Sequence, residues 1–414
     1  MHEIRIGILL GVKQMVRANK WMSLLMICVV SFTFLNLVVI QGILLGITEG
    51  ALESTRTQAL SDITIEPSPE QGYIEHSQQL LRELVQYPDI ASYSERYEEL
   101  AVIEANYHVP IGGQDPDVIG VNIFGVDPLR EMETVDTKSI MGEGEFLIPE
   151  ERGYIVIGKH YIDRYAKDYG DMYDSLRDIH PGSVVRIWVG EESYEFTVKG
   201  IIDSKVDMAS LSVFISEKDF RRIFNRADFN VNKILVRLVD KTRSEQVARS
   251  LNHSNISEDV RIKVFSEDIP KLITDVRDTF SKLSLVISSI SVFVATITVF
   301  IIIFINVLSR RRQIGILKAI GVSRTTLVWA YVTQAACYGF LGIGIALMAL
   351  YGYIIPYFIQ NPIDFPYTYV SLYLTTYDIV FRAGMLTLML IVAGYIPARM
   401  IIRQNTLNVI TGRT

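Results

Sequence analysis

The sequence contains no recognisable catalytic or metal-binding motif. A phosphate-binding loop needs Gly-x-x-x-x-Gly-Lys-Ser/Thr, whereas Gly7 and Gly11 precede Lys13 at the wrong spacing. The six histidines are scattered, and no two lie four residues apart as in a helical zinc site. Carboxylates are abundant, but on an acidic surface they are mostly solvated. We therefore expect no enzyme activity, no cofactor and no metal in this chain.

A tyrosine- and aspartate-rich segment, Tyr161–Pro181, offers contact chemistry instead. Its tyrosines recur every four residues, which places them on one stripe of a helix. The stripe either packs against its own domain or forms an exposed contact element, because tyrosine is favoured at protein interfaces. The candidate contact residues are Tyr161, Tyr165, Tyr169 and Tyr173.

The chain is more apolar than a soluble domain of its size needs to be. Of its 414 residues, 49% are hydrophobic, and the mean hydropathy is +0.26. The excess lies in four stretches whose only charged residue is Arg382, and each is long enough for the ~20 helical residues that cross a bilayer. They are Trp21–Thr48, Leu283–Ser309, Thr325–Ile363 and Ile379–Ala398. We expect transmembrane helices at residues 21–48, 281–309, 325–355 and 378–398. Gly352, Pro356 and Pro362 should end the third helix and start an external loop over 356–377.

Five polar side chains fall inside these apolar stretches. In lipid such groups either join helices by hydrogen bonds or line a path for a substrate. The arginine either reaches the outer membrane surface with its stem buried or serves a function within the membrane. The candidate intramembrane contacts are Asn36, Gln41, Asn306, Gln334 and Arg382.

The charges of the flanking segments predict the orientation. Residues 1–20 carry a net charge of +3, residues 309–324 +5 and residues 399–414 +3, whereas residues 49–282 carry −16. Since cytoplasmic segments are enriched in Lys and Arg, we expect both termini in the cytoplasm and the acidic region outside the plasma (inner) membrane. The acidity of that region argues against nucleic-acid binding.

The first 20 residues are predicted to form a basic amphipathic helix on the cytoplasmic side. Ile4, Ile8, Val12 and Val16 recur at helical spacing, with Lys13 off their stripe. Such a helix lies along the membrane surface and serves either as an anchor or as a contact for a partner. Residues 399–414 are predicted as a cytoplasmic tail.

Residues 49–280 mix strand and helix patterns and predict an α+β domain of two lobes. Helical stalks at Ile47–Leu60 and after Pro270 would carry it. Its core must hold without disulfides, because Cys28 and Cys337 both lie in predicted spans. Strands are expected at Asp62–Glu66, Val118–Val126, Val184–Val189, Tyr194–Ile202, Val213–Ile215 and Lys233–Val239, and helices at Glu75–Gln86 and Glu217–Phe224.

The loop at residues 310–324, between the second and third spans, is predicted to be a short helix with a stop and a restart. Ile314, Leu317 and Ile320 share a face, Gly321 suits the left-handed position after the helix, and Ser323 can cap the next span. This apolar ridge either anchors the loop at the membrane or docks into a groove of a partner. The candidate docking residues are Arg310, Arg311, Arg312, Ile314, Gly315, Leu317, Lys318, Ala319 and Gly321.

The segment Arg312–Ser323 resembles the signature of the FtsX-like, MacB-type permeases of ABC transporters. The order of parts is also similar: one span, a large external domain and three further spans. The layout is like that of LolC and LolE, without a fused ATPase domain, although their Met-Asn-Gly-Phe pattern is absent near Gly42–Gly50. Three segments of the domain resemble the MacB-type periplasmic core, namely Asp62–Pro67, Val121–Pro128 and Phe196–Ile202.

The resemblance implies a permease subunit that dimerises with a second copy or a paralogue and works with a separate cytoplasmic ATPase. ATP and Mg²⁺ would bind in that partner, and Arg310–Gly321 would be the coupling helix. Movement of the external domain would export or extract a hydrophobic, lipidated or peptide substrate, with an extracytoplasmic adaptor, hydrolase or lipoprotein as a further partner. One alternative is an FtsX-like signaller that activates a cell-wall hydrolase without transport; a second is an enzyme with its active site outside.

Overall fold

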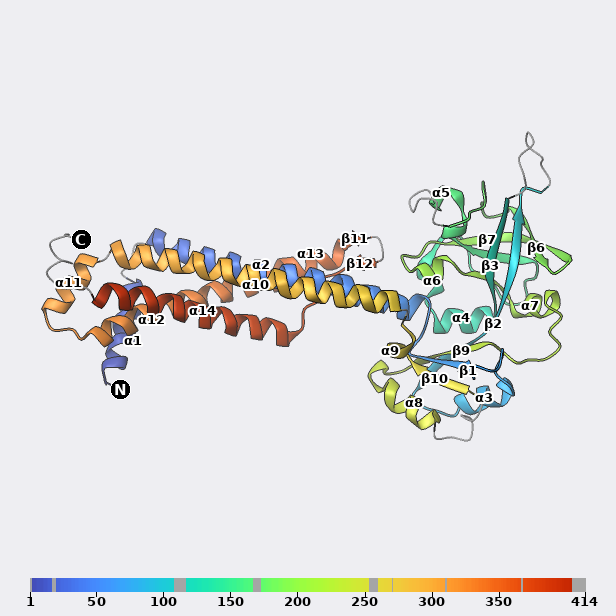
Figure 1. Ribbon diagram of the computed structural model, residues 1–414, viewed down its shortest axis with the longest axis horizontal. Coiled ribbons are helices and arrows are strands. Elements are labelled where there is room, and N and C mark those ends of the chain that lie inside the picture. Colours follow the sequence, from blue (N-terminus) through green and yellow to red (C-terminus); the bar gives the residue numbers. More distant parts are fainter. Residues whose placement is uncertain are drawn as a thin grey trace. The chain divides into compact units, whose positions relative to one another are not determined.

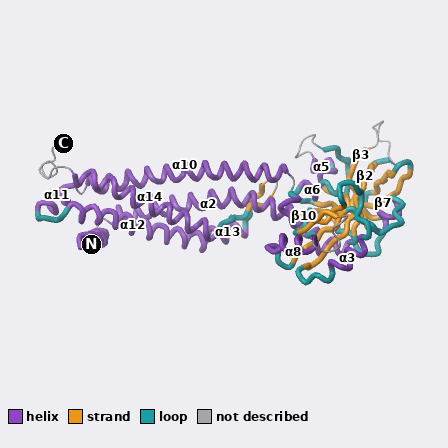
Figure 2. The backbone as a smooth tube through the Cα atoms, turned by 60° about the horizontal axis from the view of Figure 1, so that its bottom comes forward, coloured by secondary structure: helices purple, strands orange, loops and turns teal. Residues whose placement is uncertain are grey.

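The computed structural model describes residues 2–16, 20–107, 117–166, 173–252, 260–269, 271–309, 311–365 and 368–403. The chain divides into two compact units. The helical unit holds residues 1–49, 275–364 and 370–414, and the β-rich unit holds residues 50–274 and 365–369. Figure 2 shows the difference in secondary structure between them. The stalks predicted at Ile47–Leu60 and after Pro270 fall at the division between the units and stay a prediction.

Four helices are long and apolar enough to cross a membrane, which confirms the predicted number of spans among the described residues. They are α2 (Lys20–Gln58), α10 (Lys271–Ser309), α12 (Arg324–Ala349), which continues as described below, and α14 (Thr376–Arg403). Two shorter helices accompany them, α1 (His2–Val16) and α11 (Arg311–Ala319).

The third apolar helix does not end where its sequence suggests. A π-helical turn at Leu350–Ile354 follows α12, and helix α13 (Ile355–Gln360) continues the same path. Pro356 lies in the first turn of α13, where a proline removes no needed hydrogen bond, and the wider π-turn absorbs the change of register. The predicted loop at 356–377 is therefore wrong in its first residues. Its remainder contains a small hairpin of β11 (Ile363–Phe365) and β12 (Thr368–Val370).

Small residues let the helices approach closely. A Cβ atom at Gly11 of α1 would lie 2.5 Å from the carbonyl oxygen of Ala330 in α12, and Gly7 is equally crowded. Gly342 of α12 faces Val30 of α2, and Ser31 donates a hydrogen bond to the Gly342 carbonyl over 2.7 Å. Close approach through small residues replaces the hydrophobic effect that lipid cannot supply. Helix α1 is thus packed against α12, while its Ile8 and Val12 stay exposed.

The β-rich unit contains a sheet of ten strands together with helices, which agrees with the predicted α+β class. Its strands are β1 (Ile63–Pro67), β2 (Ile90–Ala105), β3 (Asp117–Val126), β4 (Met141–Gly144), β5 (Tyr154–Gly158), β6 (Val184–Val189), β7 (Glu192–Ile202), β8 (Val213–Ser216), β9 (Lys233–Leu238) and β10 (Val260–Val264). Its helices are α3 (Ser77–Leu84), α4 (Pro128–Thr134), α5 (Asp163–Ala166), α6 (Asp207–Ser210), α7 (Glu217–Ile223), α8 (Ser244–Asn252) and α9 (Phe265–Asp268).

The long strand β2 divides this sheet into two lobes. Its first half pairs with β9, which continues through β1 to β10. Its second half pairs with β3 on one edge and β6 on the other. Because β3 leads through β8, β5 and β7 back to β6, six strands close into a ring whose inward side chains are buried. Figure 1 shows β2 and β3 side by side along their length.

Buried charges hold the residues that follow α2. Arg96 on β2 pairs with Glu131 of α4, and Ser94 Oγ donates to the same carboxylate over 2.6 Å. Both members of the pair are nearly inaccessible to solvent. Arg96 Nη1 also donates to the Ala59 carbonyl oxygen at 3.1 Å, so the chain leaving α2 is bonded directly to the sheet.

Candidate functional site

Helix α11 ends in a hydrogen-bonded stop that its sequence predicts. Val322 N–H donates to the Leu317 carbonyl and Gly321 N–H to the Lys318 carbonyl, both at 3.1 Å. Gly321 has φ of +96°, a left-handed conformation that favours glycine. Ser323 Oγ then accepts the Thr326 N–H at 3.2 Å and caps α12. The predicted stop at Gly321 and restart at Ser323 are confirmed.

The predicted apolar ridge of this loop is split between two faces. Ile314 is only 2% exposed, and Leu317 packs with it against the buried cluster that includes Val307 and Leu327. Ile320 is 71% exposed and Ile316 is 53% exposed, four residues apart on the opposite face. A single ridge of Ile314, Leu317 and Ile320 is therefore wrong: the first two side chains fasten α11 to the spans.

The remaining candidate residues fall on both faces of α11. Gly315 is buried, Ala319 and Gly321 are exposed, and Lys318 is half-buried. Burial, with Arg324 nearby, lowers the pKa of Lys318. Arg311 and Arg312 lie in the first turn of α11, and Arg310 lies outside the described residues. Figures 1 and 2 place α11 at the same end of the helical unit as α1.

Sequence reasoning missed Ile316 as a member of the exposed face. Its signal was present, because Ile316 and Ile320 are spaced as i and i+4. Nothing in the sequence showed which side of α11 rests on the spans. The exposed surface formed by Ile316, Ala319 and Ile320 is called the outer face of α11 below.

Gln41 joins two helices directly, and Gln334 supports a second contact between helices through Tyr338. Ser288 Oγ of α10 donates to Gln41 Oε1 of α2 over 2.6 Å. Gln334 Nε2 donates to the Tyr338 hydroxyl at 3.0 Å, and that hydroxyl also meets Ser23 Oγ at 2.9 Å. Asn36 is exposed and Arg382 is half-buried, whereas the side chain of Asn306 lies outside the described residues. These contacts favour helix joining over a continuous polar path.

The described part of the tyrosine segment is not one continuous helix. Its helical residues include Asp163–Ala166 of α5, and Ile162 forms an isolated bridge with Leu176. The Tyr161 hydroxyl donates to the Leu211 carbonyl at 3.0 Å, and the Tyr165 hydroxyl donates to Glu143 Oε1 at 2.6 Å. Tyr173 stacks on His160, and Tyr169 lies outside the described residues. Tyr161 and Tyr165 thus fasten the segment to its own domain, and their use by a partner stays a prediction.

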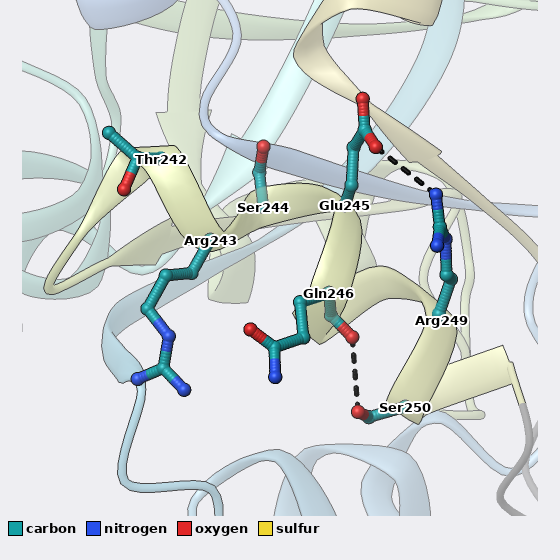
Figure 3. Close-up of a pocket in the computed structure, with 7 residues that line it drawn as sticks. All are labelled: Thr242, Arg243, Ser244, Glu245, Gln246, Arg249 and Ser250. Carbon is teal, nitrogen blue, oxygen red and sulfur yellow. Dashed lines mark hydrogen bonds and ion pairs between the residues drawn. The ribbon is translucent and has the colours of Figure 1, made fainter.

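A hollow of about 750 Å³ beside α8 offers no convergent site. Figure 3 shows that all seven lining residues come from one stretch, Thr242–Ser250. Its polar groups are used locally: Arg249 pairs with Glu245 at 3.2 Å, and Ser250 donates to the Gln246 carbonyl. Within the described ranges, no group of three or more His, Cys, Asp or Glu side chains is placed to hold a metal ion.

The part of the chain that contains α11 is similar to a known protein family. The family described as FtsX-like permease C-terminal matches residues 285–406. The chain is 25% identical over 281 residues to an ABC transporter permease of Methanocaldococcus jannaschii, a match that covers 65% of either chain, just under two thirds of that relative's length. It is 23% identical over 324 residues to the lipoprotein-releasing system transmembrane protein LolC of Neisseria meningitidis, covering 75% of this chain and 74% of LolC.

A solved structure aligns with part of this chain at low identity. The periplasmic region of MacB from Actinobacillus actinomycetemcomitans aligns with a TM-score of 0.35 and 14% identity. The alignment covers 52% of this chain and 94% of that one.

Proposed function

We propose that this chain, which is an ABC transporter permease of the FtsX, LolC and MacB type, couples ATP hydrolysis in a separate subunit to movement of its β-rich domain. The outer face of α11 carries this proposal. Ile316 and Ile320 present apolar surface on a helix whose other side is fixed to the spans by Ile314 and Leu317. A short helix held in this way can transmit a push from a docked partner.

The proposed arrangement puts α11 and both termini in the cytoplasm. The net positive charges of the segments around α1 and α11 support that orientation in the plasma (inner) membrane. The ATPase would dock on the outer face of α11 and bind ATP with Mg²⁺. A second copy of the chain, or a paralogue, would complete a dimer, as the resemblance implies.

The proposed substrate is a hydrophobic, lipidated or peptide molecule that is extracted or exported outside the membrane. The similarity to LolC, a protein of a lipoprotein-releasing system, supports a lipidated substrate. The hydrogen bonds that join α10 to α2 through Ser288 and Gln41, and α12 to α2 through Tyr338 and Ser23, support movement of helices as joined levers.

Reconstitution of the full chain with its ATPase in liposomes tests the proposal. Transport predicts that ATP turnover rises when a lipidated or apolar peptide is added, and that the molecule leaves the membrane. The signalling alternative predicts turnover that responds only to a cell-wall hydrolase. Turnover that is the same with and without the permease would contradict coupling altogether.

A further inference from the structure

A cavity of about 210 Å³ lies within the β-rich unit, next to the residues that follow α2. Its walls come from Ala59 and Leu60 just after α2, from strands β2, β3 and β9, and from α6 with the residues after it. Groups that are far apart in the sequence therefore converge on one space. This is the convergence that the hollow beside α8 lacks.

One side of the cavity is apolar. Leu60, Phe124, Met208 and Leu211 line it. An apolar cavity of about 150 Å³ in another protein accepts benzene. The space here is therefore large enough for one phenyl-sized group with a short chain.

The other side presents hydrogen-bond acceptors. Asn122 Nδ2 donates to Glu98 Oε1, and because a carboxylate only accepts, this contact fixes the orientation of the amide. Asn122 Oδ1 is then left buried, with no hydrogen-bond partner among the described residues. A buried acceptor of this kind calls for a donor.

The charges of the lining leave one anion without a counter-ion. Arg96 is paired with Glu131, and Lys233 Nζ is 3.1 Å from Glu66 Oε1. Glu98 forms no ion pair within the part of the chain that the structure describes. A positive donor in the cavity would therefore match Glu98.

We propose that this cavity binds a primary ammonium group that carries a compact apolar body. The ammonium would donate to Glu98, while the apolar body lies against Phe124 and Leu211. A free amine and the N-terminus of a peptide with an apolar first side chain share this chemistry. The site goes beyond the proposed function, because its binding requires no ATPase. Since Leu60 follows α2 closely, an occupant would contact the link between α2 and the sheet.

Binding of phenethylamine to the full chain in nanodiscs tests the site, with saturation-transfer NMR or calorimetry as the readout. We expect saturable binding that weakens at least about tenfold in Glu98→Gln. Glu99→Gln is the matched control, since Glu99 is the next residue on β2, points to the opposite face and reaches only Arg226, at 3.8 Å. Met208→Trp fills the cavity from a partly exposed position and should abolish binding with an unchanged unfolding temperature.

Three comparison ligands separate the effect of the charge from that of apolar contact and identify the source of the amine. Phenethyl alcohol has the same apolar body without the charge and should bind much more weakly. A Phe-Ala-Ala peptide amide should compete with phenethylamine if peptide N-termini are accepted, and its N-acetylated form should not. Equal binding of amine and alcohol, unchanged binding in Glu98→Gln and Met208→Trp, or no saturable binding at all would overturn the proposal.

Discussion

Replacing Ile316 and Ile320 together with alanine should weaken association with the ATPase while leaving the fold intact. Ile316 is 53% exposed and Ile320 is 71% exposed, so neither contributes its full side chain to the packing of the spans. Full burial of an isoleucine side chain stabilises by about 1.5–3 kcal/mol. Burying only the exposed fractions in a partner's groove therefore adds roughly 2–4 kcal/mol for the pair. Its loss corresponds to a rise in Kd of about 30- to 700-fold.

The assay is titration of the purified ATPase onto the full-length chain in nanodiscs. Ile359→Ala is the matched control, because Ile359 is 69% exposed but lies in α13 rather than at α11. Leu317→Ala is the structural control: it should lower the unfolding temperature, since Leu317 packs against the buried cluster of the spans. The reasoning is refuted if the double variant binds the ATPase as tightly as the parent chain, or if Ile359→Ala weakens binding equally.

Three further predictions concern packing and titration. Gly11→Leu should lower the thermal stability of the chain, because even a Cβ atom at Gly11 would lie 2.5 Å from the Ala330 carbonyl; an unchanged unfolding temperature would show that α1 packs elsewhere. Arg96→Met leaves Glu131 buried without its partner and should cost about 3–5 kcal/mol in denaturant unfolding, a loss that a solvated pair would not show. Burial raises the pKa of Glu95 from 4.5 to about 7 despite its contact with Arg130. The folded state then holds the proton more tightly than the unfolded chain, so stability should fall by up to about 3 kcal/mol as the pH rises from about 4.5 to 7. Glu95→Gln should flatten that slope, and a parallel profile would contradict the assignment.

The features that sequence reasoning placed correctly depend on local patterns. Alternating side chains identify β1 and β9, and the run from Val184 to Ile202 contains the turn signal that separates β6 from β7. Apolar runs identify the four long helices, because about 20 apolar residues in succession are what a helix needs to cross a bilayer. Gly321 marks a helix stop because, without a Cβ atom, it adopts the left-handed conformation easily, and Ser323 marks a helix start because its hydroxyl caps α12.

The features that it missed depend on contacts distant in sequence. Strand β2 includes Glu98, Glu99, Leu100 and Ala101, residue types that favour a helix, yet it is a strand because β3 and β9 pair with it. The tyrosine spacing at 161–173 matches a helix, but the bridge from Ile162 to Leu176 folds the segment otherwise.

The sequence also could not predict which face of α11 is exposed, because that depends on contacts with distant parts of the chain. Ile314, Leu317 and Ile320 are all aliphatic residues at helical spacing, and only packing against the buried cluster of the spans distinguishes the buried members from the exposed one. The rotation of a short helix about its axis is set by the spans on either side. Its own sequence contains no information about that rotation.

Site-specific crosslinking tests the central claim most directly. In a chain with Cys28 and Cys337 replaced by serine, Ile320→Cys would be treated with a short thiol-to-amine crosslinker in membranes that contain the proposed partner ABC ATPase, with Ile359→Cys as the comparison. We predict a crosslink to the ATPase from position 320 and none from position 359, and an increase in the yield from position 320 when ATP is bound. A crosslink from position 359 instead, or none from position 320 although its thiol is labelled, would contradict ATPase coupling through α11.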